Sequence, residues 1–179
     1  MPHATMEKLD AGLDEVRRSP KDDGVLKMIV RRPGVDKREV LEEAELSQKV
    51  GLVGDSWSSR ATRHWTPHPD TQLTLMNSRT ATLVAQDKDR WPLAGDQLYI
   101  DLDLSVENLP PGTRLSLGTA IIEVTDQAHT GCSKFAARFG KDAMEFVNSP
   151  VGRELNLRGI NARVTQSGRI RVGDIANRI

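Results

Sequence analysis

Cys132 is the only cysteine among 179 residues, and it lies within residues 129–134, which read HTGCSK. A single thiol cannot form a disulfide within the chain, so its role is either packing or reactivity. Lys134 and His129 can place positive charge near the sulfur. The residues from Ser133 onward predict the first turn of a helix, whose amide groups favour a thiolate. These neighbours favour a reactive thiol over an inert, buried one.

Positive charge is concentrated near this cysteine, although 25 basic and 25 acidic residues balance over the whole chain. Residues 1–128 hold 16 basic and 21 acidic side chains, whereas residues 129–179 hold 9 and 4. Seven of those nine are arginines, whose planar guanidinium group binds phosphate or carboxylate. We expect a small anionic ligand rather than nucleic acid, because a nucleic-acid-binding chain would be basic throughout and richer than 4% in aromatic residues.

Two further patterns of polar residues have ordinary explanations. A cysteine hydrolase would use Cys132, His129 and Asp126, but such triads are usually assembled from distant segments. Turn chemistry explains three Gly-Asp pairs, because glycine tolerates positive φ and aspartate bonds to the local backbone. The aspartates of these pairs are Asp55, Asp96 and Asp174.

Residues 56–71 predict an irregular loop with two features that resemble binding sites. His64 and His68 have a spacing found in metal sites, but the prolines at positions 67 and 69 exclude the helix that would align both rings. Trp57 and Trp65 flank two arginines and could border a pocket. We expect an ordinary loop without zinc, in which the tryptophans cover the core.

Composition places the chain among globular proteins, with 37% hydrophobic residues and a mean hydropathy of −0.46. The first ten residues contain no apolar stretch typical of a signal peptide. No apolar run approaches the roughly 20 residues that span a bilayer. For that reason we expect no membrane partner. Because the single cysteine is unpaired, we expect a cytoplasmic location.

Short strands dominate the elements that must position Cys132. Alternating apolar residues predict a half-buried strand over residues 98–105. Residues 160–165 and 169–172, joined by a Gln-Ser-Gly turn, predict a hairpin. Further strands are expected at residues 25–30, 73–76, 114–117 and 120–125.

Helices are fewer and shorter. The spacing of apolar residues predicts an amphipathic helix within residues 37–46, and Asn77 is expected to cap a helix that continues to Ala85. Two more helices are expected at residues 133–139 and 142–148. The fold is therefore predicted as a mixed β-barrel, mainly β with α insertions. Residues 1–24 are expected to be a polar N-terminal extension and residues 25–179 a single domain.

An ordered series of motifs over roughly residues 25–175 resembles the MOSC family, the domains named for the C-terminal part of molybdenum cofactor sulfurase. Any one of these motifs is weak, but their order along the chain is specific. They are the Arg-Arg-Pro segment ending at Pro33, Gly54-Asp55, Gly95-Asp96, residues 111–115, Gly118, residues 120–125, the run from His129 to Phe135, residues 138–140, Arg158-Gly159-Ile160, Arg163-Val164, residues 168–170 and Gly173-Asp174.

The resemblance implies a MOSC-like mixed β-barrel with one key cysteine, which falls on Cys132. MOSC domains are associated with the molybdenum cofactor (molybdopterin). Some carry sulfur destined for metal centres, and others belong to enzymes that reduce N-hydroxylated compounds, in which the cysteine is a molybdenum ligand. Cys132 is thus implied as the catalytic thiolate and the metal ligand. The candidates for binding the pterin phosphate are His129, Lys134, Arg138 and Arg158.

The chain resembles a stand-alone, single-domain member of the family. We expect it to lack the pyridoxal-phosphate desulfurase domain of the sulfurases and the N-terminal barrel and ferredoxin modules of other relatives. The resemblance therefore implies that sulfur or electrons come from a partner, either a sulfur donor or an electron-transfer protein. Three roles stay open at this point: a molybdenum-dependent oxidoreductase, a sulfur transferase, or a non-catalytic module that binds and delivers cofactor or sulfur.

Overall fold

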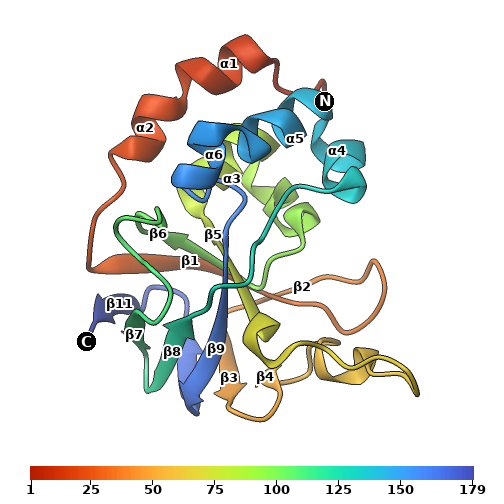
Figure 1. Cartoon of the computed structure of the whole chain (residues 1–179), viewed down its shortest axis with the longest axis vertical. Coiled ribbons are helices and arrows are strands. Elements are labelled where there is room, and N and C mark those ends of the chain that lie inside the picture. Colours follow the sequence, from red (N-terminus) through yellow and green to blue (C-terminus); the bar gives the residue numbers. More distant parts are fainter.

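Seven strands close into a mixed barrel in the computed structural model, which describes residues 1–179 (Figure 1). Around the barrel they run in the order β11-β7-β8-β9-β5-β6-β1, and antiparallel pairing of β11 with β1 completes the ring. Only β5 and β6 are parallel. The strands are β1 (Gly24–Arg31), β5 (Leu73–Asn77), β6 (Leu98–Asp101), β7 (Arg114–Leu117), β8 (Ala120–Val124), β9 (Ile160–Gln166) and β11 (Ile175–Arg178). The predicted β-barrel with helical insertions is confirmed.

Two smaller groups of strands flank the barrel. β2 (Glu39–Leu41) pairs with β1 at an edge. A second sheet has the order β10-β3-β4 and is formed by β10 (Gly168–Arg171), β3 (Glu43–Ser47) and β4 (Gly51–Leu52). This sheet lies against the barrel, because Leu46, Leu52 and Ile170 belong to the same apolar cluster as the barrel interior.

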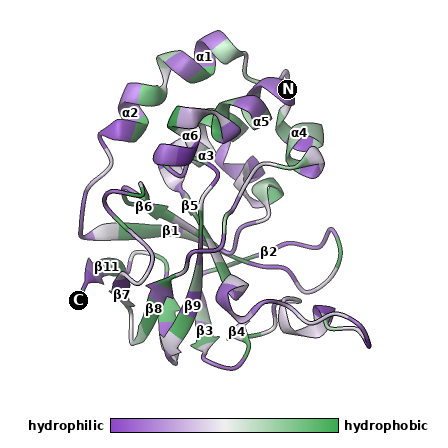
Figure 2. Cartoon of the chain, viewed as in Figure 1, coloured by the Kyte–Doolittle hydropathy of each residue, from purple (hydrophilic) through white to green (hydrophobic).

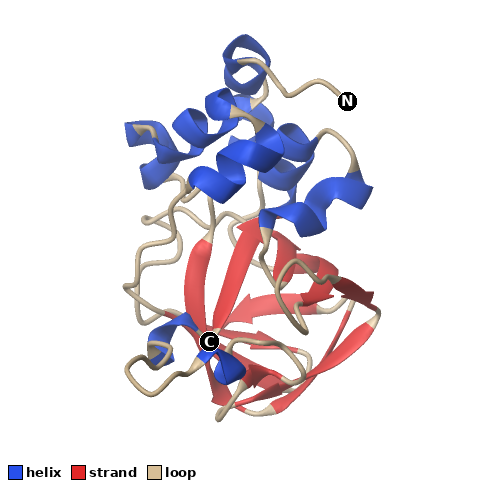
Figure 3. Cartoon of the chain, turned by 90° about the vertical axis from the view of Figure 1, so that its right-hand side faces the viewer, coloured by secondary structure: helices blue, strands red, loops and turns tan.

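The α-helices gather over one end of the barrel, as Figure 3 shows. None of them is long and apolar enough to cross a lipid bilayer. They are α1 (Met6–Ala11), α2 (Leu13–Arg17), α3 (Ser78–Ala85), α4 (Ser133–Phe139), α5 (Lys141–Asn148) and α6 (Pro150–Glu154). Three short 3-10 helices complete the fold: η1 (Ser58–Arg60), η2 (Pro69–Thr71) and η3 (Lys88–Ala94).

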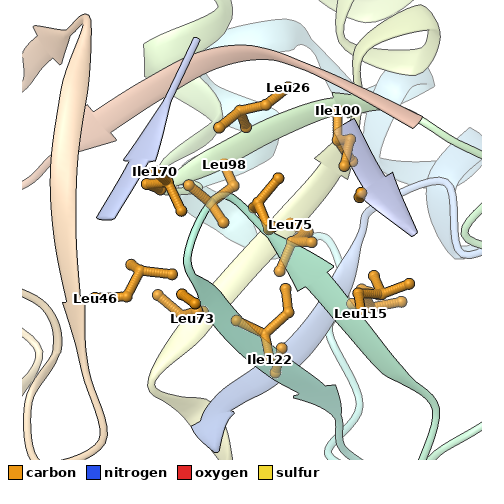
Figure 4. Packing of buried hydrophobic residues seen from close by; sticks show 14 of the residues in the cluster. Leu26, Leu46, Leu73, Leu75, Leu98, Ile100, Leu115, Ile122 and Ile170 are labelled. Atoms are coloured by element: carbon orange, nitrogen blue, oxygen red, sulfur yellow. The ribbon is translucent and has the colours of Figure 1, made fainter. Parts of the chain in front are cut away.

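Two apolar clusters hold these layers together. The first fills the barrel and contains 21 buried residues, among them Leu75, Leu98 and Ile122 (Figure 4). The second contains 18 and joins the helices to the outer face of the barrel wall through Met76 and Tyr99. Alternation explains this division, since successive residues of one strand point to opposite faces of the sheet.

The first 24 residues, expected as a polar extension, include α1 and α2 and pack on the helical layer. Leu9 is fully buried in the second cluster. The backbone N–H of Met6 donates to Asp142 at 2.9 Å, and Gln86 donates to the Pro2 carbonyl at 2.8 Å. Figure 2 shows why a polar segment can do this, because both helices carry hydrophobic as well as hydrophilic residues.

Two expected elements are wrong. Residues 37–46 form β2 and the start of β3 instead of a helix, because Ala44 and Leu46 also satisfy a period of two and β10 and β4 offer partners. Strands β9 and β10 do not form a hairpin, because β8 and β5 occupy both edges of β9. β10 therefore pairs with β3 in the second sheet.

Candidate functional site

Cys132 caps the N-terminus of α4, at the end of the loop that follows β8, and its side chain is exposed. Asn148 on α5 holds this loop in place. Its Oδ1 accepts from the Gly131 N–H at 2.8 Å, and its Nδ2 donates to the Gly131 carbonyl at 2.9 Å. The loop therefore presents Cys132 to solvent in a defined position.

The surroundings of Cys132 favour the thiolate. The backbone N–H of Phe135, in the first turn of α4, lowers the pKa of the thiol most strongly. Partial burial opposes this effect, and the Lys134 N–H and the charge of Arg158 add to it. A thiolate is the form of cysteine that acts as nucleophile and metal ligand, so the thiol is prepared for either role.

Four cationic side chains line a cavity of about 570 Å³ beside this helix. Lys134 and Arg138 come from α4, Arg38 comes from the end of the β1–β2 loop, and Arg60 comes from η1. The pKa of Arg38 is lowered by burial and by the charges of Arg138 and Arg32. These cations therefore lie close together. Crowded cations in a concave site attract an anion.

A buried ion pair fixes the loop that carries Arg38. The Asp55 carboxylate accepts from Arg32 at 2.7 Å and from the Trp57 backbone N–H at 3.1 Å. Arg32 also donates to the Gly95 carbonyl at 2.9 Å. Burial raises the pKa of Asp55, but the hydrogen bond and charge of Arg32 outweigh it, so the net pKa is lowered.

A second buried network lies between the barrel wall and α4. The carboxylate of Asp96 is fully buried and contacts Arg158 at 2.6 Å and His129 Nε2 at 2.8 Å. The Arg158 guanidinium lies 5.0 Å from the centre of the Phe135 ring. Burial raises the pKa of Asp96, but the charge of Arg158 and the hydrogen bonds from His129 and Arg158 hold it well below its usual value. Asp96 is therefore ionised, and Arg158 is its permanent counter-ion.

The structure separates the predicted phosphate-binding residues into two groups. Lys134 and Arg138 line the basic cavity, where Arg138 also donates to the Leu93 carbonyl at 2.9 Å and pairs with Asp36 at 3.3 Å. His129 and Arg158 meet at Asp96 instead, and both border a different cavity of about 200 Å³ behind the Cys132 loop. The first group shares its cavity with Arg38 and Arg60, whereas His129 meets Arg60 in a neighbouring cavity of about 260 Å³.

Several alternatives from the sequence are decided by these contacts. Asp126 accepts from Gln127 at 3.1 Å, whereas the carboxylate that binds His129 belongs to Asp96, so the Cys-His-Asp arrangement with Asp126 does not form. No group of three His, Cys, Asp or Glu residues could hold a metal ion, and His68 Nδ1 accepts a local backbone N–H at 3.1 Å. Trp57 is buried as expected, but Trp65 is 53% exposed.

The sequence does not single out Arg38 or Arg60, and it does not predict the role of two Gly-Asp aspartates. Asp174 accepts the Arg171 backbone N–H at 2.7 Å, which is the expected turn chemistry. Asp55 and Asp96 are buried in ion pairs instead. Asp55 is distant from Arg32 in the sequence, and Asp96 is distant from Arg158. No local pattern therefore predicts these ion pairs.

Residues 65–176 match the MOSC domain. The chain belongs to the MOSC family. This match includes Cys132, Lys134, Arg138, His129 and Arg158, while Arg38 and Arg60 lie before it. No curated protein matches the chain.

Solved structures share the fold of this MOSC protein at low sequence identity. A hypothetical protein superposes with a TM-score of 0.61 at 19% identity, over 92% of this chain and 70% of the other. The YUAD protein from Bacillus subtilis gives a TM-score of 0.59 at 15% identity, over 86% and 93%. YiiM from Escherichia coli gives 0.57 at 19% identity, over 87% and 69%. At these identities the likeness concerns the fold alone.

Proposed function

We propose that this MOSC protein binds the molybdenum cofactor, with Cys132 as a thiolate ligand of molybdenum, and reduces N-hydroxylated compounds. One observation carries the proposal. An exposed cysteine whose pKa is lowered precedes the helix turn that carries Lys134 into a cavity with four cations. The cofactor joins a soft, thiolate-binding metal to an anionic phosphate, so it needs both features together.

The residues present fit such a group. Lys134, Arg138, Arg38 and Arg60 would hold the phosphate through charge-assisted hydrogen bonds. A neighbouring cavity of about 260 Å³ shares Arg60 and is bordered by Trp57 and Trp65, which offer flat apolar faces to a ring system. When bound, molybdenum supplies two-electron redox chemistry. The protein holds the thiolate, binds the anion and orients the ligand.

Each turnover of this reduction consumes two electrons, which a partner would supply. We therefore propose an electron-transfer protein as the partner. Because the single cysteine is unpaired, we also propose the cytoplasm as the place of action. The proposed enzyme class is a molybdenum-dependent oxidoreductase.

The exposure of Cys132 also favours a second function, sulfur carriage. The Cys132 thiolate would attack the outer sulfur of a donor persulfide, form Cys132–S–SH and release the donor thiolate. This exchange needs a lowered thiol pKa and an accessible sulfur but no second catalytic residue. A module that only binds and delivers cofactor would use the same contacts without turnover.

Pterin content in protein purified from a cofactor-producing host tests the proposal. We expect pterin in the wild type, its loss in Cys132→Ala and a marked reduction in Arg60→Gln. Lys141→Gln is the matched control, because it also removes one positive charge but from a side chain that is 79% exposed on α5. Absence of pterin from the wild type would overturn cofactor binding. Mass spectrometry that then found one added sulfur atom on Cys132 would support sulfur carriage.

A further inference from the structure

His129 has one ring edge engaged and one edge free. Its Nε2 contacts Asp96 Oδ1 at 2.8 Å, and its Cδ2 faces Gly159, where an added Cβ would lie 3.1 Å away. Nδ1 has no hydrogen-bond partner in the protein. The side chain is 18% exposed and borders the cavity of about 260 Å³.

Asp96 decides which nitrogen of His129 carries the hydrogen. Because Arg158 keeps Asp96 ionised, its carboxylate can only accept, and Nε2 must donate. Nδ1 is then left with a lone pair. Burial and the charge of Arg158 lower the pKa of His129, and Arg32 adds to this, while Asp96 opposes it. A neutral imidazole with a free Nδ1 is a hydrogen-bond acceptor, not a phosphate-binding cation.

The cavity that His129 borders also contains two guanidinium groups. His129 lies three residues before Cys132 and borders the cavity of about 260 Å³ together with Arg32 and Arg60. Guanidinium groups can only donate. Asn161 in the same cavity donates its amide to the Gln127 carbonyl at 3.0 Å, which leaves its Oδ1 as a second acceptor.

From this geometry we infer that His129 Nδ1 accepts a hydrogen bond from an N–H or O–H group of the ligand bound at the Cys132 site, with Asp96 as its positioning residue. The inference rests on the proposed function for the identity of that ligand. The donor can belong to the cofactor or to the N–OH group of a substrate. Both sources present the same chemistry to Nδ1.

The tautomer of His129 tests the inference without any ligand. Imidazole ¹⁵N spectra of the wild-type protein at neutral pH should show hydrogen on Nε2 and an unbonded Nδ1. In Asp96→Asn, where Arg158 loses its counter-ion, this tautomer should no longer be fixed. A wild-type His129 that is doubly protonated, or that carries hydrogen on Nδ1, would overturn the inference whether or not cofactor binds.

Two matched variants separate the ligand contact from the contact with Asp96. His129→Gln places an amide near the Nε2 position and can still donate to Asp96, but it lacks an acceptor at Nδ1. His129→Asn places its Oδ1 near Nδ1 but is too short to reach Asp96. A purely structural role predicts that His129→Gln behaves as wild type. An acceptor role predicts that His129→Asn retains more binding than His129→Gln.

The readouts distinguish the source of the donor. Retained pterin reduced about tenfold in His129→Gln would place the donor on the cofactor. Unchanged pterin, with KM for an N-hydroxylated amidine raised about tenfold, would place it on the substrate. Wild-type values for both would overturn the inference. Absence of pterin from the wild type would overturn the proposed function, and the tautomer alone then decides the assignment of Nδ1.

Discussion

The barrel interior and the layer between the barrel wall and α4 are both buried, but the second contains paired charges. The interior holds a cluster of 21 apolar residues. The layer outside the wall contains Asp96, Arg158 and His129 beside Phe135. Apolar burial stabilises the fold directly, whereas buried charges are tolerated only when they are paired. The charged layer also acts on the thiol, because the charge of Arg158 helps to lower the pKa of Cys132.

We expect the largest loss of stability when the charge of Asp96 is removed from the charged layer. Asp96→Asn leaves Arg158 buried without a counter-ion, so we expect the free energy of unfolding to fall by about 3–5 kcal/mol. Urea denaturation measures this change. Glu145→Gln is the control, because it removes one charge from an exposed pair with Lys141 and should cost at most about 1 kcal/mol. Equal effects of the two variants would contradict the importance of the buried network.

Leu75→Ala tests how much the apolar interior of the barrel contributes to stability. Leu75 is fully buried in the barrel, so we expect a loss of about 2–5 kcal/mol from the cavity that the substitution creates. Unlike Asp96→Asn, it should leave the reactivity of Cys132 unchanged in the fraction that remains folded. Iodoacetamide labelling below the unfolding temperature measures this, and Val106→Ala, at an exposed position, is the control.

The two regions should also respond differently to pH. The pKa of His129 is lowered by burial, so protonation favours the unfolded state. Its contribution to stability is complete above the ordinary value of about 6.5 and is lost as pH falls through the lower folded value. We expect a smaller loss of stability on acidification in His129→Gln than in wild type. Thermal unfolding between neutral and mildly acidic pH would show it, and identical profiles would exclude His129 as the cause.

The smallest expected effect concerns Cys132 itself. Its pKa is lowered, chiefly by the Phe135 N–H, so the midpoint of iodoacetamide labelling against pH should lie below that of a free cysteine, about 8.5. The same protein unfolded in urea is the control, since unfolding removes the helix turn. A folded midpoint equal to or above the unfolded one would contradict an activated thiol.

Two expectations that depended on neighbouring residues agreed with the structure. The side chain of Asn77 accepts from the Arg79 N–H at 2.8 Å at the start of α3, and α4 begins directly after Cys132. Expectations that needed the partner strand did not agree. Residues 169–172 looked like the second strand of a hairpin, yet both edges of β9 were taken by other strands.

The sequence by itself determined the strand-rich pattern, the family series of motifs and the position of a lone cysteine at a helix start, because these depend on short-range periodicity and local hydrogen bonding. Only the tertiary structure decided which charges meet. Asp96 and Arg158 are 62 residues apart, and Arg38 and Arg60 reach the cavity of Lys134 from a loop and a 3-10 helix far from α4 in sequence. Which of these residues meet depends on how the barrel closes and where the helices then pack. Local sequence patterns do not predict such long-range contacts.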